Sequence, residues 1–175
     1  MRWLVDGYNV IRRSPGLAGV ERSGLEAGRQ ALCALLTRAA RASGDDFTVV
    51  FDGSQAGGTA SGGAGVRVVF SSARETADRV LARMASGGGA VVSNDREVRR
   101  AAARAGAIAI TADEFLSRLD RAERAAPGTA EEGEGGEGSD EAEDAPRGPK
   151  KGNPRRLSKK RRAAARALGR LRFGL

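Results

Sequence analysis

Short apolar runs alternate with helical patterns along the first 125 residues of the chain. Five apolar runs predict strands, at residues 3–5, 47–51, 66–70, 90–92 and 107–110. Apolar residues at helical spacing predict helices over residues 25–42, 75–85, 96–105 and 112–124. Strands of this kind separated by helices are typical of a parallel sheet covered on both faces. The pattern therefore predicts an α/β fold with a mainly parallel sheet of about five strands.

The segment between the second and third predicted strands is rich in glycine. Residues 57–65 contain five glycines among nine residues. We predict an irregular loop there, which serves as a flexible connection or as a flap near the substrate. Arg67 interrupts the next apolar run, so we expect the strand at residues 66–70 to lie nearer an edge of the sheet.

A change of composition near residue 127 marks the end of the predicted folded domain, residues 1–126. Residues 127–149 are acidic, rich in glycine and poor in large apolar side chains. Such a segment buries too little apolar surface to offset the entropy of ordering, so we predict a disordered acidic linker. Residues 150–175 form a basic tail, in which Leu168 and Leu171 would allow a helix that forms on a partner.

The net charge of +8 is unevenly distributed. Residues 131–144 carry eight acidic side chains and no basic ones, whereas residues 147–172 carry twelve basic side chains and no acidic ones. A basic segment of this kind either binds the phosphates of nucleic acid with little sequence preference or remains a solvated tail.

The chain has no histidine and a single cysteine, Cys33. This composition excludes internal disulfides, zinc sites built on histidine or cysteine, and catalysis by a Ser–His or Cys–His pair. Cys33 lies among leucines at helical spacing, so we predict a core residue. Chemistry near neutral pH must then depend on carboxylates, hydroxyls, Lys, Arg or a bound metal. No apolar run approaches the roughly 20 residues that span a bilayer, and we expect a cytoplasmic protein without membrane contact.

Three predicted strands end in, or are closely followed by, an aspartate: Asp6, Asp52 and Asp95. Asp78 lies in the first turn of a predicted helix that should begin at the same edge of the sheet, where the carboxyl ends of parallel strands meet. Neighbouring carboxylates repel one another unless a proton or a cation neutralises them. Oxygen ligands without histidine or cysteine suit Mg²⁺ or Mn²⁺. The sequence therefore predicts a divalent-metal site that supports hydrolysis of phosphodiester bonds.

Several residues near these aspartates have more than one interpretation. Asn9 and Asn94 are candidates to bind the metal or to hold a water molecule on it. Glu75 suits a metal ligand as well as it suits a helix cap or a supporting residue. An aspartate after a strand also commonly caps the next helix, and we assign Asp113 to that duty. Tyr8 either stacks on a base or packs beneath the first loop.

Four short motifs occur in a fixed order along residues 1–125. They are Leu4-Val5-Asp6-Gly7-Tyr8-Asn9-Val10-Ile11, Val50-Phe51-Asp52-Gly53, Glu75-Thr76-Ala77-Asp78 and Val92-Ser93-Asn94-Asp95. Together they resemble the YacP-like type of NYN domain, a family of PIN-like nucleases. The first motif is specific, and the others are short. The resemblance implies a PIN-like α/β/α sandwich, a divalent-metal site and endonucleolytic cleavage of RNA.

The resemblance assigns the acidic positions of the family to Asp6, Asp78 and Asp95, and supporting positions to Asn9 and Asp52. Relatives often have Thr-Ser-Asp in the last motif. This chain has Ser93-Asn94-Asp95 there, so an asparagine precedes the aspartate. Our candidate catalytic residues are Asp6, Asn9, Asp78 and Asp95. Our candidate metal ligands are Asp6, Asp78, Asp95 and Asp52, with Asn94 and Glu75 in supporting roles.

The leading hypothesis is an endoribonuclease that hydrolyses RNA with a carboxylate-bound Mg²⁺ or Mn²⁺ and an activated water. The first alternative is a non-catalytic RNA- or ribosome-binding protein with a vestigial site, although a surface that only binds RNA gains nothing from a negative edge. A phosphatase or a DNA-directed nuclease would use the same site. The candidates for RNA contacts in the basic tail are Arg155, Arg156, Lys159, Lys160, Arg161 and Arg162. The sequence leaves the oligomeric state open.

Overall fold

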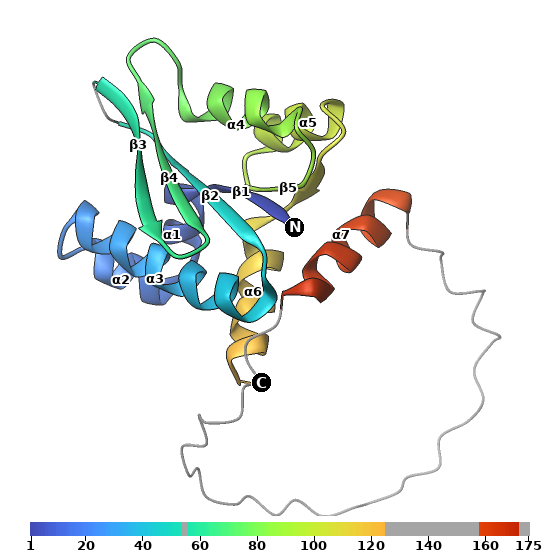
Figure 1. Ribbon diagram of the computed structural model, residues 1–175, viewed down its shortest axis with the longest axis horizontal. Coiled ribbons are helices and arrows are strands. Elements are labelled where there is room, and N and C mark those ends of the chain that lie inside the picture. The colour runs from blue at the N-terminus through green and yellow to red at the C-terminus, as the bar shows by residue number, and fades with distance from the viewer. Residues whose placement is uncertain (54–55, 125–157, 172–175) are drawn as a thin grey trace, which may run out of the picture.

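The computed structural model describes residues 1–53, 56–124 and 158–171, and it shows a six-stranded sheet between two layers of helices (Figure 1). The strands are β1 (Arg2–Asp6), β2 (Asp46–Phe51), β3 (Ala56–Gly63), β4 (Val66–Ser72), β5 (Ala90–Val92) and β6 (Ile108–Ile110). The helices are α1 (Gly7–Arg13), α2 (Pro15–Glu21), α3 (Leu25–Ser43), α4 (Ala77–Ala85), α5 (Arg96–Arg104), α6 (Ala112–Arg124) and α7 (Lys159–Arg170). This architecture confirms the predicted α/β sandwich.

The strands lie in the order β3-β4-β2-β1-β5-β6. Strand β1 pairs in parallel with β2 on one side and with β5 on the other, and β4 and β6 extend the parallel sheet outward. Only β3 is antiparallel, on the outer side of β4. Because the chain builds outward from β1 to β4 and then returns to the other side of β1, the topological switch of the sheet lies between β1 and β5.

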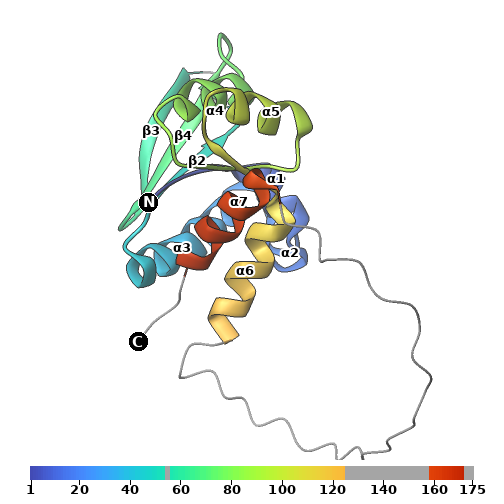
Figure 2. The same cartoon turned by 90° about the vertical axis from the view of Figure 1, so that its right-hand side faces the viewer.

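Each face of the sheet has its own hydrophobic core. Helices α1, α2, α3, α6 and α7 cover one face, and α4 and α5 cover the other (Figures 1 and 2). Alternate residues of a strand point to opposite faces, so Trp3 and Val5 belong to the larger core while Leu4 belongs to the smaller one. Cys33 is buried in the larger core, as predicted.

The prediction of an irregular loop at residues 57–65 was wrong, because much of this segment belongs to β3. The strand pairs with β4 through backbone hydrogen bonds, which need no large side chains. Close packing even favours glycine here, since a Cβ on Gly62 would lie 2.8 Å from Cγ1 of Val66. Strand β4 is consequently one strand in from the edge, which agrees with the position nearer an edge that we expected from Arg67.

Two short helices, α1 and α2, lie between β1 and α3, where we predicted no element. Ser14 ends the first of them and caps the second, and Pro15 occupies the first turn of α2, where its missing N–H costs nothing. The helix predicted over residues 75–85 begins instead at Ala77. It begins there because the Thr76 side chain caps it by accepting a hydrogen bond from the Arg79 amide at 3.4 Å.

The basic tail contributes a helix, α7, which packs on the chain's own domain. Ala164, Ala167 and Leu171 are buried in the larger core. Helices α6 and α7 lie side by side (Figure 2), and the Arg118 side chain of α6 donates a hydrogen bond of 2.8 Å to the Leu168 carbonyl. A helix of 12 residues is marginal by itself, so this packing accounts for its formation.

The acidic linker predicted at residues 127–149 lies outside the described residues, and so do Arg155 and Arg156. The boundaries that we drew between domain, linker and tail therefore stay predictions. In the part of the chain that the structure describes, no helix combines the length and the apolar character needed to cross a membrane.

Candidate active site

Asp6 and Asp95 lie on the two sides of the topological switch. Asp6 is the last residue of β1, and Asp95 follows β5 after two residues. These strands are parallel neighbours, so both aspartates stand at the edge formed by the carboxyl ends of the strands. Open parallel sheets bind their ligands outside this edge, at the switch point. The sequence placed both residues correctly with respect to the sheet.

Two hydrogen bonds hold the Asp6 carboxylate. Its Oδ1 accepts from the Asn9 amide at 3.4 Å, which caps α1, and its Oδ2 accepts from Ser93 Oγ at 2.8 Å. Burial raises the pKa of Asp6 above its ordinary value, and the charges of Asp78 and Asp95 raise it further, whereas the two hydrogen bonds oppose the rise. Asp6 therefore acts as a helix cap and also carries a charge that its surroundings disfavour.

Ser93, which the sequence analysis did not single out, connects Asp6 to Asp95. Its side chain is fully buried; Oγ donates to Asp6 and accepts from the Asp95 amide at 3.0 Å. Asp95 in turn caps α5, because its Oδ1 accepts from the amides of Glu97 and Val98 at 2.6 and 3.1 Å. Oδ2 of Asp95 accepts no hydrogen bond from the described residues, and the residue is exposed. One carboxylate oxygen thus remains open at this edge.

Asp78 approaches the same edge from α4. It lies in the first turn of this helix, but Thr76 provides the cap, and no described residue donates a hydrogen bond to the Asp78 carboxylate. Partial burial raises the pKa of Asp78, and the charges of Asp95 and Asp52 raise it further. Neither capping nor packing explains a carboxylate that is repelled by two others, so a role in binding a cation is the simpler explanation.

Asp52 follows β2 and is exposed. Its Oδ1 accepts a hydrogen bond from Ser71 Oγ, and Ser71 Oγ accepts one from the Gly53 amide at 3.2 Å. Ser71 is buried, like Ser93, and it was likewise not predicted from the sequence. The charge of Asp52 affects the pKa of Asp78 but is not among the causes that shift the pKa of Asp6. Asp52 therefore interacts with Asp78 at the margin of the cluster.

These aspartates have the donor chemistry of a hard divalent cation, because all their ligand atoms are carboxylate oxygens. Burial is the main cause of the raised pKa values of Asp6 and Asp78, and a cation would offset the repulsion that adds to it. Across residues 1–53, 56–124 and 158–171, however, no group of three or more acidic, cysteine or histidine side chains is arranged to hold a metal ion. The residues fit a divalent cation in donor type and charge, whereas their arrangement does not form a complete ligand cage.

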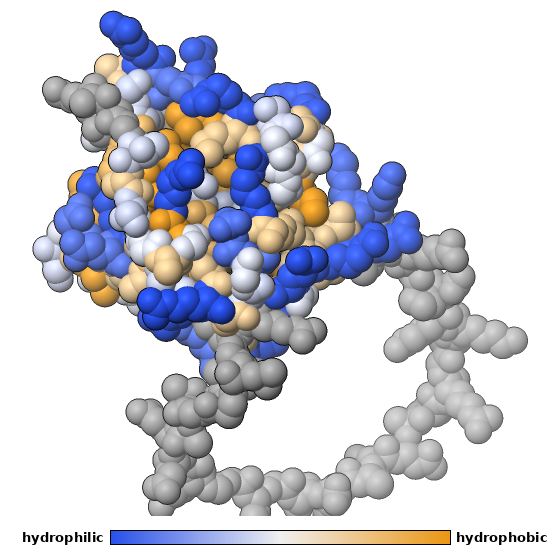
Figure 3. Space-filling view, in the orientation of Figure 1, coloured by the Kyte–Doolittle hydropathy of each residue, from blue (hydrophilic) through white to orange (hydrophobic). Residues whose placement is uncertain are grey.

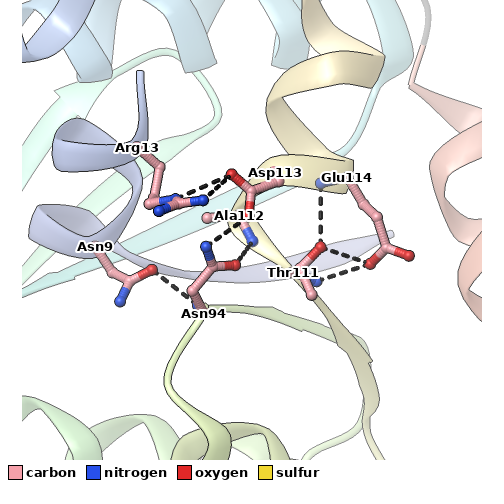
Figure 4. Close-up of polar contacts among 7 residues, drawn as sticks. All are labelled: Asn9, Arg13, Asn94, Thr111, Ala112, Asp113 and Glu114. Atoms are coloured by element: carbon pink, nitrogen blue, oxygen red, sulfur yellow. Dashed lines mark hydrogen bonds and ion pairs between the residues drawn. The ribbon is translucent and has the colours of Figure 1, made fainter. Parts of the chain in front are cut away.

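Asn9 and Asn94 belong to a hydrogen-bond network that joins α1, the loop after β5 and the start of α6 (Figure 4). Asn9 Oδ1 accepts from the Asn94 amide at 2.8 Å. The Asn94 side chain accepts from the Ala112 amide at 2.9 Å and donates to Asp113 at 2.7 Å, while Arg13 donates to Asp113 at 3.0 Å. Both ends of the Asn94 amide are therefore in use, which favours a positioning role over direct metal binding.

Helices α5 and α6 are capped in different ways. Thr111 and Glu114 form a capping box at the start of α6: Thr111 Oγ1 accepts from the Glu114 amide at 3.1 Å, and Glu114 Oε2 accepts from the Thr111 amide at 3.0 Å (Figure 4). At α5, by contrast, the cap is Asp95 rather than Asn94. Asp113, which we expected to serve the start of α6, pairs with α1 and Asn94 instead; these contacts hold the pKa of Asp113 below its ordinary value, the Asn94 hydrogen bond being the main cause.

Glu75 is engaged in an ion pair before α4. Its two carboxylate oxygens accept from Arg83 Nε and Nη2, each at 3.0 Å, and the hydrogen bonds lower the pKa of Glu75. Ser72 Oγ accepts from the Glu75 amide at 3.3 Å, which forms a turn ahead of the helix and not a helix cap. With both oxygens paired to an arginine, Glu75 suits a supporting role for α4 better than a place among the metal ligands.

Gly7 allows the start of α1 to pack closely on β2. A Cβ at this position would lie 2.2 Å from Cε1 of Phe51. Tyr8 packs edge-on against the same Phe51 ring at a centroid distance of 5.1 Å, and its hydroxyl accepts from Arg29 Nε at 2.9 Å. Of the two interpretations of Tyr8, packing beneath the first loop is the one that these contacts support.

Comparisons with known proteins agree with this geometry. A family model described as the YacP-like NYN domain matches residues 3–160, which extends beyond the region that carries the four motifs. The crystal structure of Rae1 (YacP) from Bacillus subtilis is similar with a TM-score of 0.60 and 26% identity, covering 71% of this chain and 76% of that one. The crystal structure of a point mutant of the same protein gives a TM-score of 0.61 and 27% identity, covering 71% of this chain and 77% of that one. No curated protein sequence matches the chain.

Proposed function

Because the chain belongs to the YacP-like NYN domain family, with its PIN-like nuclease fold and RNA-related function, we propose that it is a metal-dependent endoribonuclease. One observation carries the proposal: three carboxylates affect one another at the switch point of the sheet. Asp6 and Asp95 are linked through buried Ser93, and the charge of Asp78 couples to both. Such a negative edge hinders simple RNA binding, so it favours catalysis.

We assign the binding of Mg²⁺ or Mn²⁺ to Asp6, Asp78 and Asp95. When bound, the cation would polarise the scissile phosphate and lower the pKa of a water molecule. The chain's own contribution is orientation. Ser93 fixes the Asp6 carboxylate and the start of the loop that carries Asp95, and Asn94 anchors that loop to α6. These groups are held before the substrate arrives, which lowers the entropy cost of the reaction.

The outer surface of α7 is the proposed contact for the RNA backbone. Its basic side chains project away from the buried Ala164 and Ala167 and form a hydrophilic row along the helix (Figure 3). The exposed residues are Lys159, Lys160, Arg161, Arg162, Arg166 and Arg170. Lys and Arg bind phosphates with little dependence on the RNA sequence. Ribosomal RNA is therefore a candidate partner for this surface, in addition to the RNA that is cut.

Cleavage of a labelled single-stranded RNA with Mg²⁺ or Mn²⁺ tests the proposal, with single-stranded DNA of the same sequence in parallel. We expect the wild type to cut RNA and to stop when EDTA removes the cation. Asp6→Asn and Asp95→Asn should each lower the rate at least about 100-fold, or roughly 2.7 kcal/mol. Asp46→Asn is the matched control, because this exposed aspartate lies at the opposite end of β2.

Three outcomes would contradict the proposal. If Asp6→Asn and Asp95→Asn cut RNA as fast as the wild type, the activity belongs to another site or to a contaminant. If every variant binds RNA and none cuts it, the non-catalytic RNA- or ribosome-binding alternative holds. Cleavage of DNA in preference to RNA would indicate a DNA-directed nuclease with the same site.

A further inference from the structure

A groove of about 360 Å³ opens between α3 and the β3–β4 pair. Its floor includes Val68 and Phe70 of β4. Arg29 and Gln30 of α3 stand on one side, and Ser61 of β3 stands on the other. An apolar surface with an aromatic ring between polar side chains is suited to a planar heterocyclic ring, which can stack on the ring and form hydrogen bonds with the polar groups.

The floor belongs to a row of aromatic rings that runs along the carboxyl edge of the sheet. The Tyr8 and Phe51 centroids are 5.1 Å apart, and the Phe51 and Phe70 centroids are 6.1 Å apart with the planes at 30°. Each strand ring is followed by a residue of the acidic edge: Asp52 comes after Phe51, and its partner Ser71 comes after Phe70. The groove and the acidic edge are therefore adjacent.

Arg29 lies over this row before any ligand is present. Its Cζ is 5.6 Å from the Tyr8 centroid, 5.7 Å from that of Phe51 and 5.4 Å from that of Phe70. Two of its nitrogens donate to the Tyr8 hydroxyl at 2.9 and 2.6 Å, and a third donates to Glu26 at 3.1 Å. Arg29 and Phe70 both remain partly exposed. They form a cationic, aromatic stacking surface that needs little reordering on binding.

We propose that this groove binds one nucleobase of a single-stranded RNA, next to the phosphate that lies at the acidic edge. The choice of RNA rests on the proposed function. The base stacks on Phe70 and on the Arg29 guanidinium, and Gln30 and Ser61 offer hydrogen-bonding groups at the rim. Every base has a π-face, so the groove contributes affinity and register on the strand rather than strict base selection.

The test compares an intact fluorescent RNA with a set in which one nucleotide at a time is abasic, bound in EDTA so that cleavage does not interfere. For the wild type, removing the base at one particular position should weaken binding about tenfold or more. Phe70→Leu should weaken binding of the intact RNA by the same factor and show no further loss with the abasic RNA. Phe70→Tyr keeps the ring and should behave as the wild type.

Two further variants distinguish a loss of base binding from a loss of folding. Val69→Ala lies on the same strand but packs against α4, so it should lower the melting temperature and leave the abasic profile unchanged. Ala34→Phe adds bulk from an exposed position that lines the groove, and it should remove the dependence on the base without deleting any core packing.

The proposal is overturned if no position is sensitive to base removal. It is equally overturned if Phe70→Leu and Ala34→Phe keep the profile of the wild type. The proposed nuclease function is judged separately, by cleavage. Asp6→Asn should lose cleavage and keep the base-dependent affinity. If Asp6→Asn cuts RNA normally, the proposed nuclease function is refuted, while the binding measurements alone decide whether the groove binds a base.

Discussion

The carboxylates of Asp6 and Asp95 each serve the fold and the candidate site at once. Asp6 uses one oxygen to cap α1 and the other to accept from Ser93, while Asp95 caps α5 with one oxygen and leaves the other open. A carboxylate oxygen has two lone pairs, so a capping bond does not prevent it from binding a cation as well. Capping therefore fixes the direction of both carboxylates without consuming them.

The Asp78 carboxylate accepts no hydrogen bond from a described residue, and its charge should cost the protein stability. Its pKa in the folded protein lies above the ordinary value of 3.8, so its ionised form is less favourable in the fold than in the unfolded chain. Asp78→Asn should therefore raise the free energy of unfolding at neutral pH, by less than about 1 kcal/mol because the residue is partly exposed. Differential scanning calorimetry in EDTA should show a melting temperature higher by up to about 3 °C.

The pH dependence of this gain checks its cause. When the pKa of a carboxyl group is higher in the folded than in the unfolded protein, the free energy of unfolding falls as the pH rises through the two pKa values. The group costs no stability at a pH where it is protonated in both the folded and the unfolded state. The advantage of Asp78→Asn should thus be full near pH 7 and vanish below pH 3.8. Asp46→Asn serves again as the control at the other edge of the sheet. A gain of equal size at every pH, or a loss of stability, would show that the disfavoured charge of Asp78 is not the reason.

The sequence predicted where the aspartates of the candidate site lie better than it predicted the residues that hold them. An aspartate that follows a run of apolar residues can be recognised in the sequence. The hydrogen bond from Ser93 to Asp6, by contrast, depends on β5 lying beside β1, which the sequence does not show directly. A serine directly after the apolar run of β5 was the only signal for it. Glu75 was ambiguous for a related reason, because its partner Arg83 is eight residues away and the turn before α4 decides whether they meet.

Among the elements, the five parallel strands were predictable because each reads as an apolar run, interrupted in β4 by the exposed Arg67. Strand β3 was not, since its pairing with β4 depends on backbone hydrogen bonds and on the absence of side-chain bulk at positions such as Gly62. The short helix α1 was hidden because it begins directly at the end of β1, with Asp6 as both last strand residue and helix cap.

The junction of β1 and α1 gives an element-level prediction at Gly7. A methyl group there would overlap the Phe51 ring, with only 2.2 Å to Cε1, so Gly7→Ala must displace either the first turn of α1 or the buried Phe51 ring. We expect a loss of about 1–3 kcal/mol in the free energy of unfolding, together with a loss of cleavage because Asp6 moves with the turn. Urea unfolding and the RNA cleavage assay measure the two effects.

Gly16 provides the matched control in the neighbouring helix α2. A Cβ at Gly16 meets nothing within 4 Å, so Gly16→Ala should be neutral or stabilising by up to about 1 kcal/mol through helix propensity. If Gly7→Ala proves as harmless as Gly16→Ala, close packing of the β1–α1 junction does not explain the glycine in the first motif.

In the molecule as a whole, α7 combines two functions on opposite faces of one helix. Its buried face completes the larger core through Ala164, Ala167 and Leu171, and its exposed face is basic. The helix therefore adds a positively charged surface to a domain that is otherwise less basic, and its packing fixes the position of that surface relative to the sheet. Packing and charge should be separable by mutation, because different residues carry them.

Replacing the four exposed residues Lys159, Lys160, Arg161 and Arg162 by Gln should weaken RNA binding and leave the melting temperature unchanged. Each phosphate contact with a single strand contributes about 0.7 to the slope of log K against log salt, so the slope should fall by about 3 if all four make contact.

Leu171→Ala should do the reverse: it removes a fully buried side chain at a cost of about 2 kcal/mol and keeps the slope. Fluorescence anisotropy over a series of KCl concentrations measures the slope. An unchanged slope in the Gln variant would mean that the basic face of α7 is only a solvated surface, and RNA would then have to be held by the sheet edge and its groove.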